Sequence, residues 1–176
     1  MSTSISPVTI LFLSLLSYAK PEHILPFLFA CLIHEIGHIA MIHCIKHCRF
    51  DFSLSGSGAI ITSPSLSYSE MILCAAVGPL CNLVFAAFFS KYPLFCRYSF
   101  CLGIYNLLPF SFLDGGSIVS AILHQITDPI SAESISKLIS CSTGLILFIL
   151  MLLLCAHPIY LFSSAILLFR ACCESP

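Results

Sequence analysis

The stretch ILPFLFACLIHEIGHIAMIHCI, residues 24–45, decides the fold. It is almost wholly apolar, and it is long enough to cross the hydrocarbon core of a bilayer as one α-helix, which takes roughly 20 residues. Its middle nevertheless contains His34, Glu35 and His38. An ionisable group at that depth costs at least a few kcal/mol and is by default functional. The stretch therefore predicts a membrane-spanning helix that carries chemistry.

The composition of the whole chain agrees with a membrane protein. Of its 176 residues, 59% are hydrophobic and 9% are charged, whereas charged residues form about a quarter of an ordinary soluble domain. This balance excludes a water-soluble globule and a disordered chain. Seven Lys or Arg residues are too few for a basic patch that binds nucleic acid. We expect an all-α polytopic protein with about six transmembrane helices, forming a single membrane-embedded domain over residues 1–176.

The remaining apolar runs support that expectation. They cover residues 5–19, 71–89, 138–156 and 159–169, together with a run that begins near Leu94. Pro109 and Gly115-Gly116 interrupt the last of these before a helical stretch at 117–125, which predicts one broken helix. The run at 5–19 is either a first span or a cleaved signal peptide, and the lack of Lys or Arg before it favours an uncleaved helix. The positions of Lys and Arg do not indicate an orientation, but six spans place both termini on one side.

Most of the eleven cysteines lie within the apolar runs. Disulfide scaffolds belong to small, loop-rich secreted chains, so these thiols are interpreted as small residues compatible with lipid. Acylation is an alternative for Cys172 and Cys173, which follow Arg170 at the end of the last run.

His34-Glu35-Ile36-Gly37-His38 has the spacing of a metal site. Side chains four residues apart lie on one face of a helix, about 5–6 Å apart at Cβ, and two imidazoles placed this way can bind one ion. The glutamate between them is not a ligand in a zinc site of this kind but the general base beside the attacking water. The alternative is a pair of structural histidines that form hydrogen bonds between helices.

A catalytic zinc site takes three protein ligands and leaves a fourth position open. Among the other acidic residues, only Asp114 is embedded in apolar sequence, in the stretch NLLPFSFLDGG at 106–116. Irregular backbone at membrane depth is tolerated where protein covers it or a wet cavity receives it. Asp114 is therefore the candidate third ligand, and its alternative role is to cap a helix that begins at Gly115.

A second pair, His43 and His47, is also spaced by four residues. At 100° per residue, His43 lies on the opposite side of the helix from His34, so the two pairs cannot share an ion. Their position at the membrane edge favours interfacial anchoring, with adventitious metal binding as the alternative. His23, His124 and His157 are likewise interpreted as interfacial.

Together these motifs resemble the site-2 protease family of intramembrane zinc metalloproteases. HEIGH and NLLPFSFLDGG look like its paired signatures, and Gly78-Pro79-Leu80-Cys81-Asn82 looks like its Gly-Pro-x-x-Asn segment. The core motifs fall within residues 24–125. With six expected spans and no PDZ-like insert, the chain is most similar to the sporulation-type branch, whose member in spore formers processes a membrane-tethered sigma-factor precursor. A carboxy-terminal nucleotide-sensing domain, common in that branch, is expected to be absent.

The resemblance implies one catalytic Zn²⁺ bound by His34, His38 and Asp114, with Glu35 as the catalytic base. It also implies that Asn106, and with less weight Asn82, help to hold substrate. The Ser- and Gly-rich stretch at 53–69, with its β-prone core at 59–62, corresponds to a β-hairpin-like loop that dips into the membrane. There it can pair with an unwound substrate, or else it is a simple flexible connection.

The predicted function is hydrolysis of a peptide bond in or near a transmembrane segment of a membrane-tethered protein, such as a sigma-factor precursor or regulator. Expected partners are that substrate and membrane-embedded regulators, but not nucleic acid, and the expected location is a bacterial cytoplasmic membrane, as a multi-pass protein. The sequence does not indicate an oligomeric state. Two alternatives remain open: a membrane metal transporter or metal sensor, in which Glu35 has no obligatory role, and a non-catalytic relative.

Overall fold

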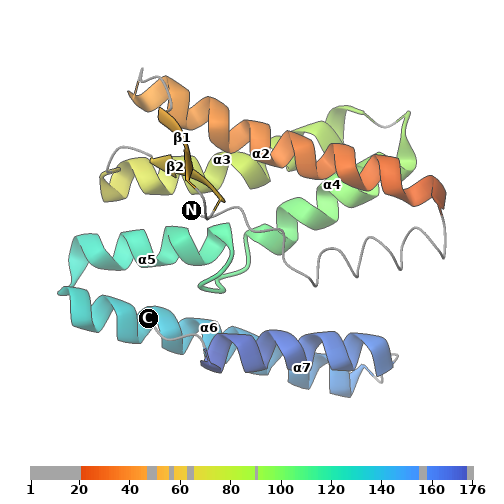
Figure 1. Ribbon diagram of the computed structural model, residues 1–176. Helices are drawn as coiled ribbons and strands as arrows, with labels where there is room; N and C mark the ends of the chain where they lie inside the picture. Colours follow the sequence, from red (N-terminus) through yellow and green to blue (C-terminus); the bar gives the residue numbers. More distant parts are fainter. Residues whose placement is uncertain are drawn as a thin grey trace.

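The computed structural model describes residues 21–46, 51–55, 58–62, 66–89, 91–154 and 158–173. Its elements are helices apart from one hairpin (Figure 1). In chain order they are η1 (Pro21–His23), α2 (Ile24–Lys46), β1 (Asp51–Ser55), β2 (Gly58–Thr62), α3 (Tyr68–Phe88), α4 (Pro93–Asn106), α5 (Asp114–Ile126), α6 (Pro129–Leu153) and α7 (Pro158–Cys173). The predicted first span at 5–19 lies outside the described residues, as do His47 and His157.

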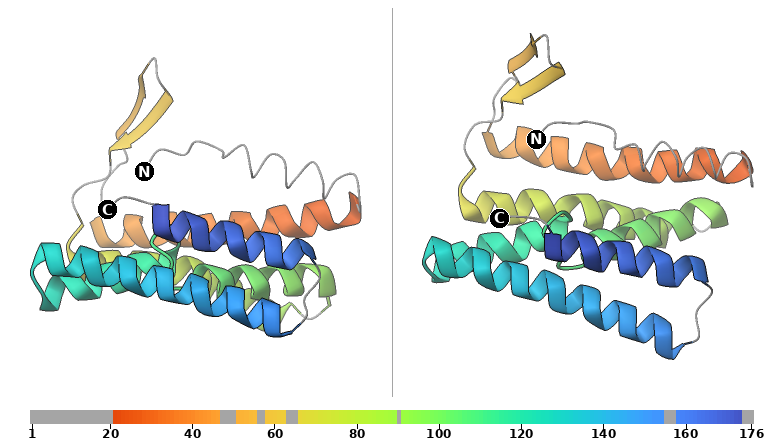
Figure 2. Two further views of the ribbon diagram at one scale, coloured as in Figure 1. Left: turned by 90° about the horizontal axis from the view of Figure 1, so that it is seen from below. Right: turned by 60° about the horizontal axis from the view of Figure 1, so that its bottom comes forward.

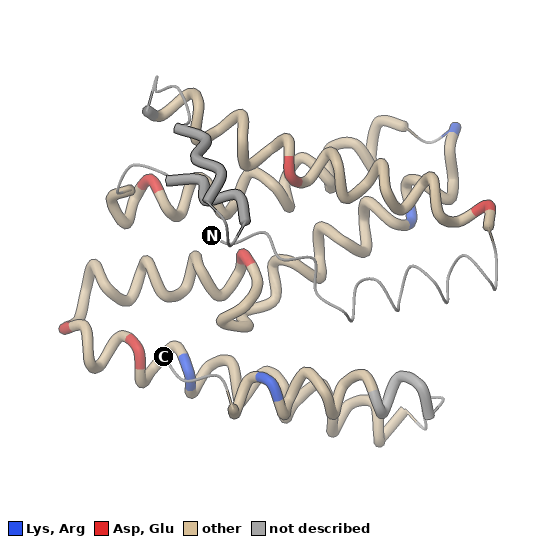
Figure 3. Tube along the Cα trace, in the orientation of Figure 1, with Lys and Arg blue, Asp and Glu red and all other residues tan. Residues whose placement is uncertain are grey.

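Three helices are long and apolar enough to cross a membrane. They cover residues 21–45, 68–88 and 129–153, which confirms helices where the sequence predicts its second, third and fifth spans. Helices α4 and α5 are shorter because the chain breaks between them, and the apolar part of α7, Ser163–Cys173, is also short. The expected total of about six spans therefore stays a prediction. Figure 3 shows how few Lys, Arg, Asp and Glu positions the helices contain.

Helix α3 lies at the centre of the packing. It contacts α2, α4 and α5, while α6 packs against α5 and α7. Both views in Figure 2 show α6 and α7 side by side. Helix α6 buries small side chains at every fourth position, which lets neighbouring backbones approach closely within a membrane. These residues are Ala132, Ser136, Ser140 and Gly144.

The predicted break around Pro109 is confirmed, but the second half of the broken helix begins earlier than expected. Helix α5 begins at Asp114, so Gly115-Gly116 form its first turn and do not interrupt it. A Cβ on Gly116 would overlap the carbonyl of Phe110. The paired glycines therefore let the helix start directly against the loop that precedes it.

Helix α6 also begins earlier than the apolar run at 138–156. Asp128 caps it by accepting a hydrogen bond from the backbone N–H of Ser131 (3.0 Å), and Pro129 occupies the first turn. Both residue types are favoured at these positions. A polar start thus extends the helix beyond its apolar part.

The β-prone stretch at 59–62 falls within β2, which pairs with β1 in an antiparallel hairpin. The register places Asp51 opposite Thr62 and Ser55 opposite Gly58. This hairpin joins α2 to α3, the two helices that bring together the histidines and Asn82.

Candidate metal centre

The two histidines of the HEIGH motif come together as the helix spacing predicts. His34 and His38 lie one turn apart on α2, with their Nε2 atoms 3.1 Å from each other. His34 is buried, and His38 is partly buried. Both lie near the middle of the span at 21–45, where neutral imidazoles can meet a ligand from a neighbouring helix.

Asp114 supplies that ligand from the first turn of α5. Its Oδ2 atom is 3.1 Å from His34 Nε2 and 3.3 Å from His38 Nε2. The residue at the N-cap of α5 is Leu113, which makes no side-chain capping bond. Asp114 is thus not the helix cap, and the interpretation of this residue as a mere cap is wrong because its carboxylate is turned towards the imidazoles.

His38 is held in one tautomer. Its Nδ1 atom is 2.7 Å from the backbone oxygen of Cys74 in α3. A carbonyl oxygen only accepts, so Nδ1 donates the hydrogen, and in the neutral ring Nε2 keeps its lone pair. This is the form in which an imidazole binds a metal, and such an outer hydrogen bond also fixes the orientation of the ring.

Gly78 makes room for the same imidazole. A Cβ at this position of α3 would overlap the His38 ring, so only glycine lets α2 and α3 approach this closely. The sequence motif pointed to Gly78 without giving this role. The carbonyl of Cys74 had no sequence signal at all, because it belongs to the backbone.

The three side chains fit a zinc ion. Ligands about 2.0–2.1 Å from a tetrahedral zinc lie about 3.3–3.4 Å from one another, and the three separations here are 3.1, 3.1 and 3.3 Å. Asp114 Oδ2 is buried without a hydrogen-bond partner among the described residues. The atoms nearest to this oxygen are the two imidazole nitrogens, and a buried carboxylate between them is stabilised by a cation that all three can bind. Among the described residues, His34, His38 and Asp114 form the group suited to a metal.

Glu35 is placed differently from the three ligands. It lies on the exposed side of α2, beside His34 along the chain and one turn before His38. Among the described residues, no hydrogen bond or ion pair holds its carboxylate. A carboxylate that is close to the ligands but exposed can contact a molecule that approaches them.

The two asparagines occupy different environments. Asn82 in α3 is 0% exposed, and its Nδ2 atom is 3.4 Å from His34 Nδ1. Asn106 ends α4, and its amide donates a hydrogen bond to the carbonyl of Leu102 in the same helix (3.1 Å). The structure thus brings Asn82 next to His34, and among the described residues no hydrogen bond joins Asn106 to the metal ligands.

The loop at 107–113, which leads to Asp114, is held by both carboxy-terminal helices. Phe110 is completely buried, and α6 forms hydrogen bonds with the backbone on either side of it through Ser140. From α7, the guanidinium of Arg170 lies 4.2 Å from the centre of the Phe112 ring. Arg170 is exposed, and a cation–π contact at an exposed site contributes about 0.5–1 kcal/mol. Protein therefore covers the irregular backbone at Phe110, as membrane depth requires, whereas Leu107 and Ser111 are exposed.

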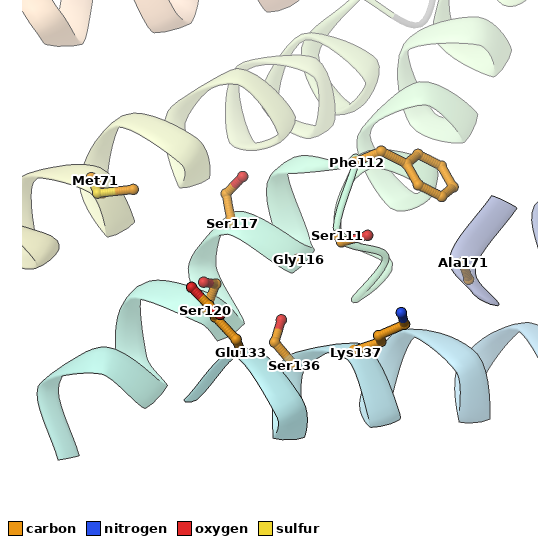
Figure 4. Close-up of a pocket in the computed structure, with 10 residues that line it drawn as sticks. All are labelled: Met71, Ser111, Phe112, Gly116, Ser117, Ser120, Glu133, Ser136, Lys137 and Ala171. Atoms are coloured by element: carbon orange, nitrogen blue, oxygen red, sulfur yellow. The ribbon is translucent and has the colours of Figure 1, made fainter. Parts of the chain in front are cut away.

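A partly polar cavity of about 520 Å³ lies between α5 and α6 (Figure 4). Helix α5 contributes Ser117, one turn after Asp114, and Ser120. From α6, Glu133, Ser136 and Lys137 project towards it, as Figure 4 shows. Apolar side chains also line the cavity, so it can receive a chain that carries both polar and apolar groups; they are Met71, Phe112 and Ala171.

The other described histidines lie away from this cluster. His43 is exposed on α2, and its predicted partner His47 lies outside the described residues. His23 contacts the hydroxyl of Tyr98 in α4 (2.7 Å), while His124 donates to the carbonyl of Ser120 in its own helix (2.8 Å). The first contact links η1 to α4, and the second lies in the last turns of α5.

Comparison with known proteins agrees with this geometry. The sequence model of Peptidase family M50 matches residues 90–152, which include Asp114 and its loop but not the HEIGH motif. Peptidases of that family are zinc metalloproteases. Among curated protein sequences, none matches the chain.

A solved structure, the site-2 protease from Methanocaldococcus jannaschii, is similar to this chain with a TM-score of 0.62. The alignment covers 92% of this chain and 83% of that one, at 22% sequence identity. At this identity the likeness shows a shared fold. It extends to α2, which the family match does not reach.

Proposed function

We propose that this protein is an intramembrane zinc metalloendopeptidase of the site-2 protease type. The observation that carries the proposal is the convergence of His34 Nε2, His38 Nε2 and Asp114 Oδ2 beside the exposed Glu35 carboxylate. The match to Peptidase family M50 and the shared fold support the same assignment.

His34, His38 and Asp114 hold the metal in this proposal, and each comes from rigid secondary structure. A bound zinc ion supplies Lewis acidity and lowers the pKa of attacking water. Glu35 accepts a proton from that water on its carboxylate and delivers it to the nitrogen of the leaving strand. The hydroxyl of the water adds to the scissile carbonyl carbon, and the carbon–nitrogen bond then breaks. The products are a new carboxyl terminus and a new amino terminus.

The substrate in this proposal is a transmembrane segment that unwinds near the cut. A helix hides its carbonyls in internal hydrogen bonds, so a peptide bond is open to attack only where the helix is broken. The polar cavity beside α5 offers hydroxyl and charged partners for a few residues of unwound chain. The β1–β2 hairpin is a second candidate, because an extended edge can pair with an extended peptide.

The finer part of the proposal concerns the substrate's identity. The motifs resemble the sporulation-type branch, which supports a sigma-factor precursor or regulator as the protein that is cut. Membrane-embedded regulatory proteins are the corresponding partners, and a bacterial cytoplasmic membrane is the corresponding location. These assignments rest on the resemblance of the sequence motifs.

The test is Glu35→Gln, with Glu22→Gln as the matched control at an exposed position in η1. Purified variants are placed in proteoliposomes with a membrane-tethered substrate, and cleavage and bound zinc are both measured. The wild type and the control should cleave, whereas Glu35→Gln should lose about 10²–10⁴-fold in rate and retain zinc. Cleavage that persists in Glu35→Gln would sink the proposal, and zinc flux without cleavage would identify a transporter.

A further inference from the structure

Asn82 is a buried polar side chain that contacts a metal ligand and that the proposed chemistry does not use. It is completely buried in α3, where its amide contacts the back of the His34 ring, and its Oδ1 atom has no hydrogen-bond partner among the described residues. A buried amide with an unpaired oxygen costs about 1–3 kcal/mol. Its depth also separates it from any molecule that approaches from the exposed side of α2.

The two imidazoles of the metal centre are supported in different ways. The ring of His38 faces a backbone carbonyl, which can only accept a hydrogen bond. The ring of His34 faces a side-chain amide, which can present either its NH₂ group or its oxygen. A half-turn of the amide exchanges the two with little change of shape.

Each orientation of the amide suits one tautomer of His34. With Nδ2 towards Nδ1, as in the structure, Nδ1 accepts and the ring proton sits on Nε2, where it can face Asp114 at 3.1 Å. With Oδ1 towards Nδ1, the ring proton moves to Nδ1 and donates to the amide. The Nε2 atom then keeps the lone pair that a metal requires.

We propose that Asn82 is a positioning residue that turns its amide oxygen towards His34 Nδ1 when the metal binds. In the metal-free state its NH₂ group supports a proton on His34 Nε2, and in the loaded state its oxygen holds the proton on Nδ1. The amide can thereby form a hydrogen bond with either tautomer of His34, whereas His38 keeps a single tautomer. This inference rests on the metal centre of the proposed function.

Three variants test the inference by zinc affinity, measured by competition with a chelator. Asn82→Leu has a similar volume but no acceptor, and it should weaken zinc binding about 10–100-fold, the range seen when a ligand loses its outer hydrogen bond. Asn82→Asp keeps an acceptor and lacks a donor, so it should bind zinc at least as tightly as the wild type. As a control, Ser99→Ala removes a fully buried hydroxyl from α4 and should leave the zinc affinity unchanged.

The ¹⁵N NMR signals of the His34 ring supply a readout that a merely structural role would not move. Zinc should shift the wild-type ring proton from Nε2 to Nδ1, and in Asn82→Asp the proton should already sit on Nδ1 without metal. If Asn82→Leu does not fold, Asn82→Asp and the wild type still decide the question.

Two results would overturn the inference: wild-type affinity in folded Asn82→Leu, or an Asn82→Asp protein weakened about 10–100-fold. A wild-type protein that binds no zinc removes the proposed function and this inference together. A wild type that binds zinc and loses cleavage on Glu35→Gln, combined with an unaffected Asn82→Leu, removes the inference alone.

Discussion

The hydroxyl of Ser140, in α6, accepts a hydrogen bond from the backbone N–H of Ser111, 3.0 Å away in the loop that leads to Asp114. The same hydroxyl donates to the carbonyl of Pro109 at 3.1 Å. Ser140 is 1% exposed, so water cannot replace either bond. A helix distant in sequence from the HEIGH motif thereby fixes the backbone that delivers the third metal ligand.

Replacing Ser140 by alanine should loosen this delivery. Two hydrogen bonds from one buried hydroxyl to the loop are lost, and at about 0.5–1.5 kcal/mol each they account for about 1–3 kcal/mol of unfolding free energy. We expect a lower melting temperature in detergent and a zinc affinity reduced about tenfold. The matched control is Ser134→Ala, because that exposed serine in α6 bonds only to the carbonyl of Ile130 in its own helix. Equal effects of the two substitutions would contradict a role for Ser140 in positioning Asp114.

The sequence predicts the ligands better than it predicts what orients them. His34 and His38 can be paired from helical spacing alone, and Asp114 stands out because an acidic residue is rare in apolar sequence. The bond from His38 to the carbonyl of Cys74 could not be foreseen, since every residue has such a carbonyl and only the packing of α2 on α3 selects one. The sequence does not predict that α5 begins at Asp114, because paired glycines usually interrupt a helix. Here the loop at 107–113 packs against Gly115 and Gly116, which only glycine permits.

Gly78 should not tolerate even a methyl group. In an isolated helix, alanine would be favoured over glycine by about 0.5–1 kcal/mol. At this position, however, its Cβ would overlap the His38 imidazole and push it from the carbonyl of Cys74. Gly78→Ala should therefore reduce zinc affinity by about tenfold or more while the protein keeps its helix content, as measured by chelator competition and circular dichroism.

The matched control for this substitution is Gly103→Ala. It adds the same methyl group to α4, where a Cβ would meet the side chain of Leu83 at 2.9 Å and the backbone oxygen of Pro79 at 3.0 Å. The control therefore crowds α3 and α4 as well, but none of these atoms belongs to a metal ligand. Zinc affinity should stay at the wild-type value in this control, and a loss equal to that of Gly78→Ala would show a general packing defect.

Metal should bind through His34 and His38 and not through His43, which lies on the same helix. His34→Ala removes one of three converging ligands and should abolish stoichiometric zinc, whereas His43→Ala alters an exposed side chain on the same helix and should leave zinc unchanged. A ligand present at 1,000 times its Kd stabilises the folded state by about 4 kcal/mol. Chelation should accordingly lower the melting temperature of the wild type and of His43→Ala, but not that of His34→Ala. Loss of zinc in His43→Ala would contradict this prediction and would indicate a metal site at the carboxy-terminal end of α2.

Filling the polar cavity should separate substrate binding from chemistry. Ser136 lines the cavity from α6 and is buried, so Ser136→Leu narrows the space without touching a metal ligand. If unwound substrate lies there, KM should rise by about tenfold or more, as happens when a pocket loses room for part of its substrate. The rate at saturation and the bound zinc should stay unchanged, because a contact made equally in the ground and transition states affects KM alone. Ser134→Leu adds the same bulk to an exposed position of α6 and controls for it. Unchanged KM in Ser136→Leu would place the unwound chain elsewhere, with the β1–β2 hairpin as the next candidate.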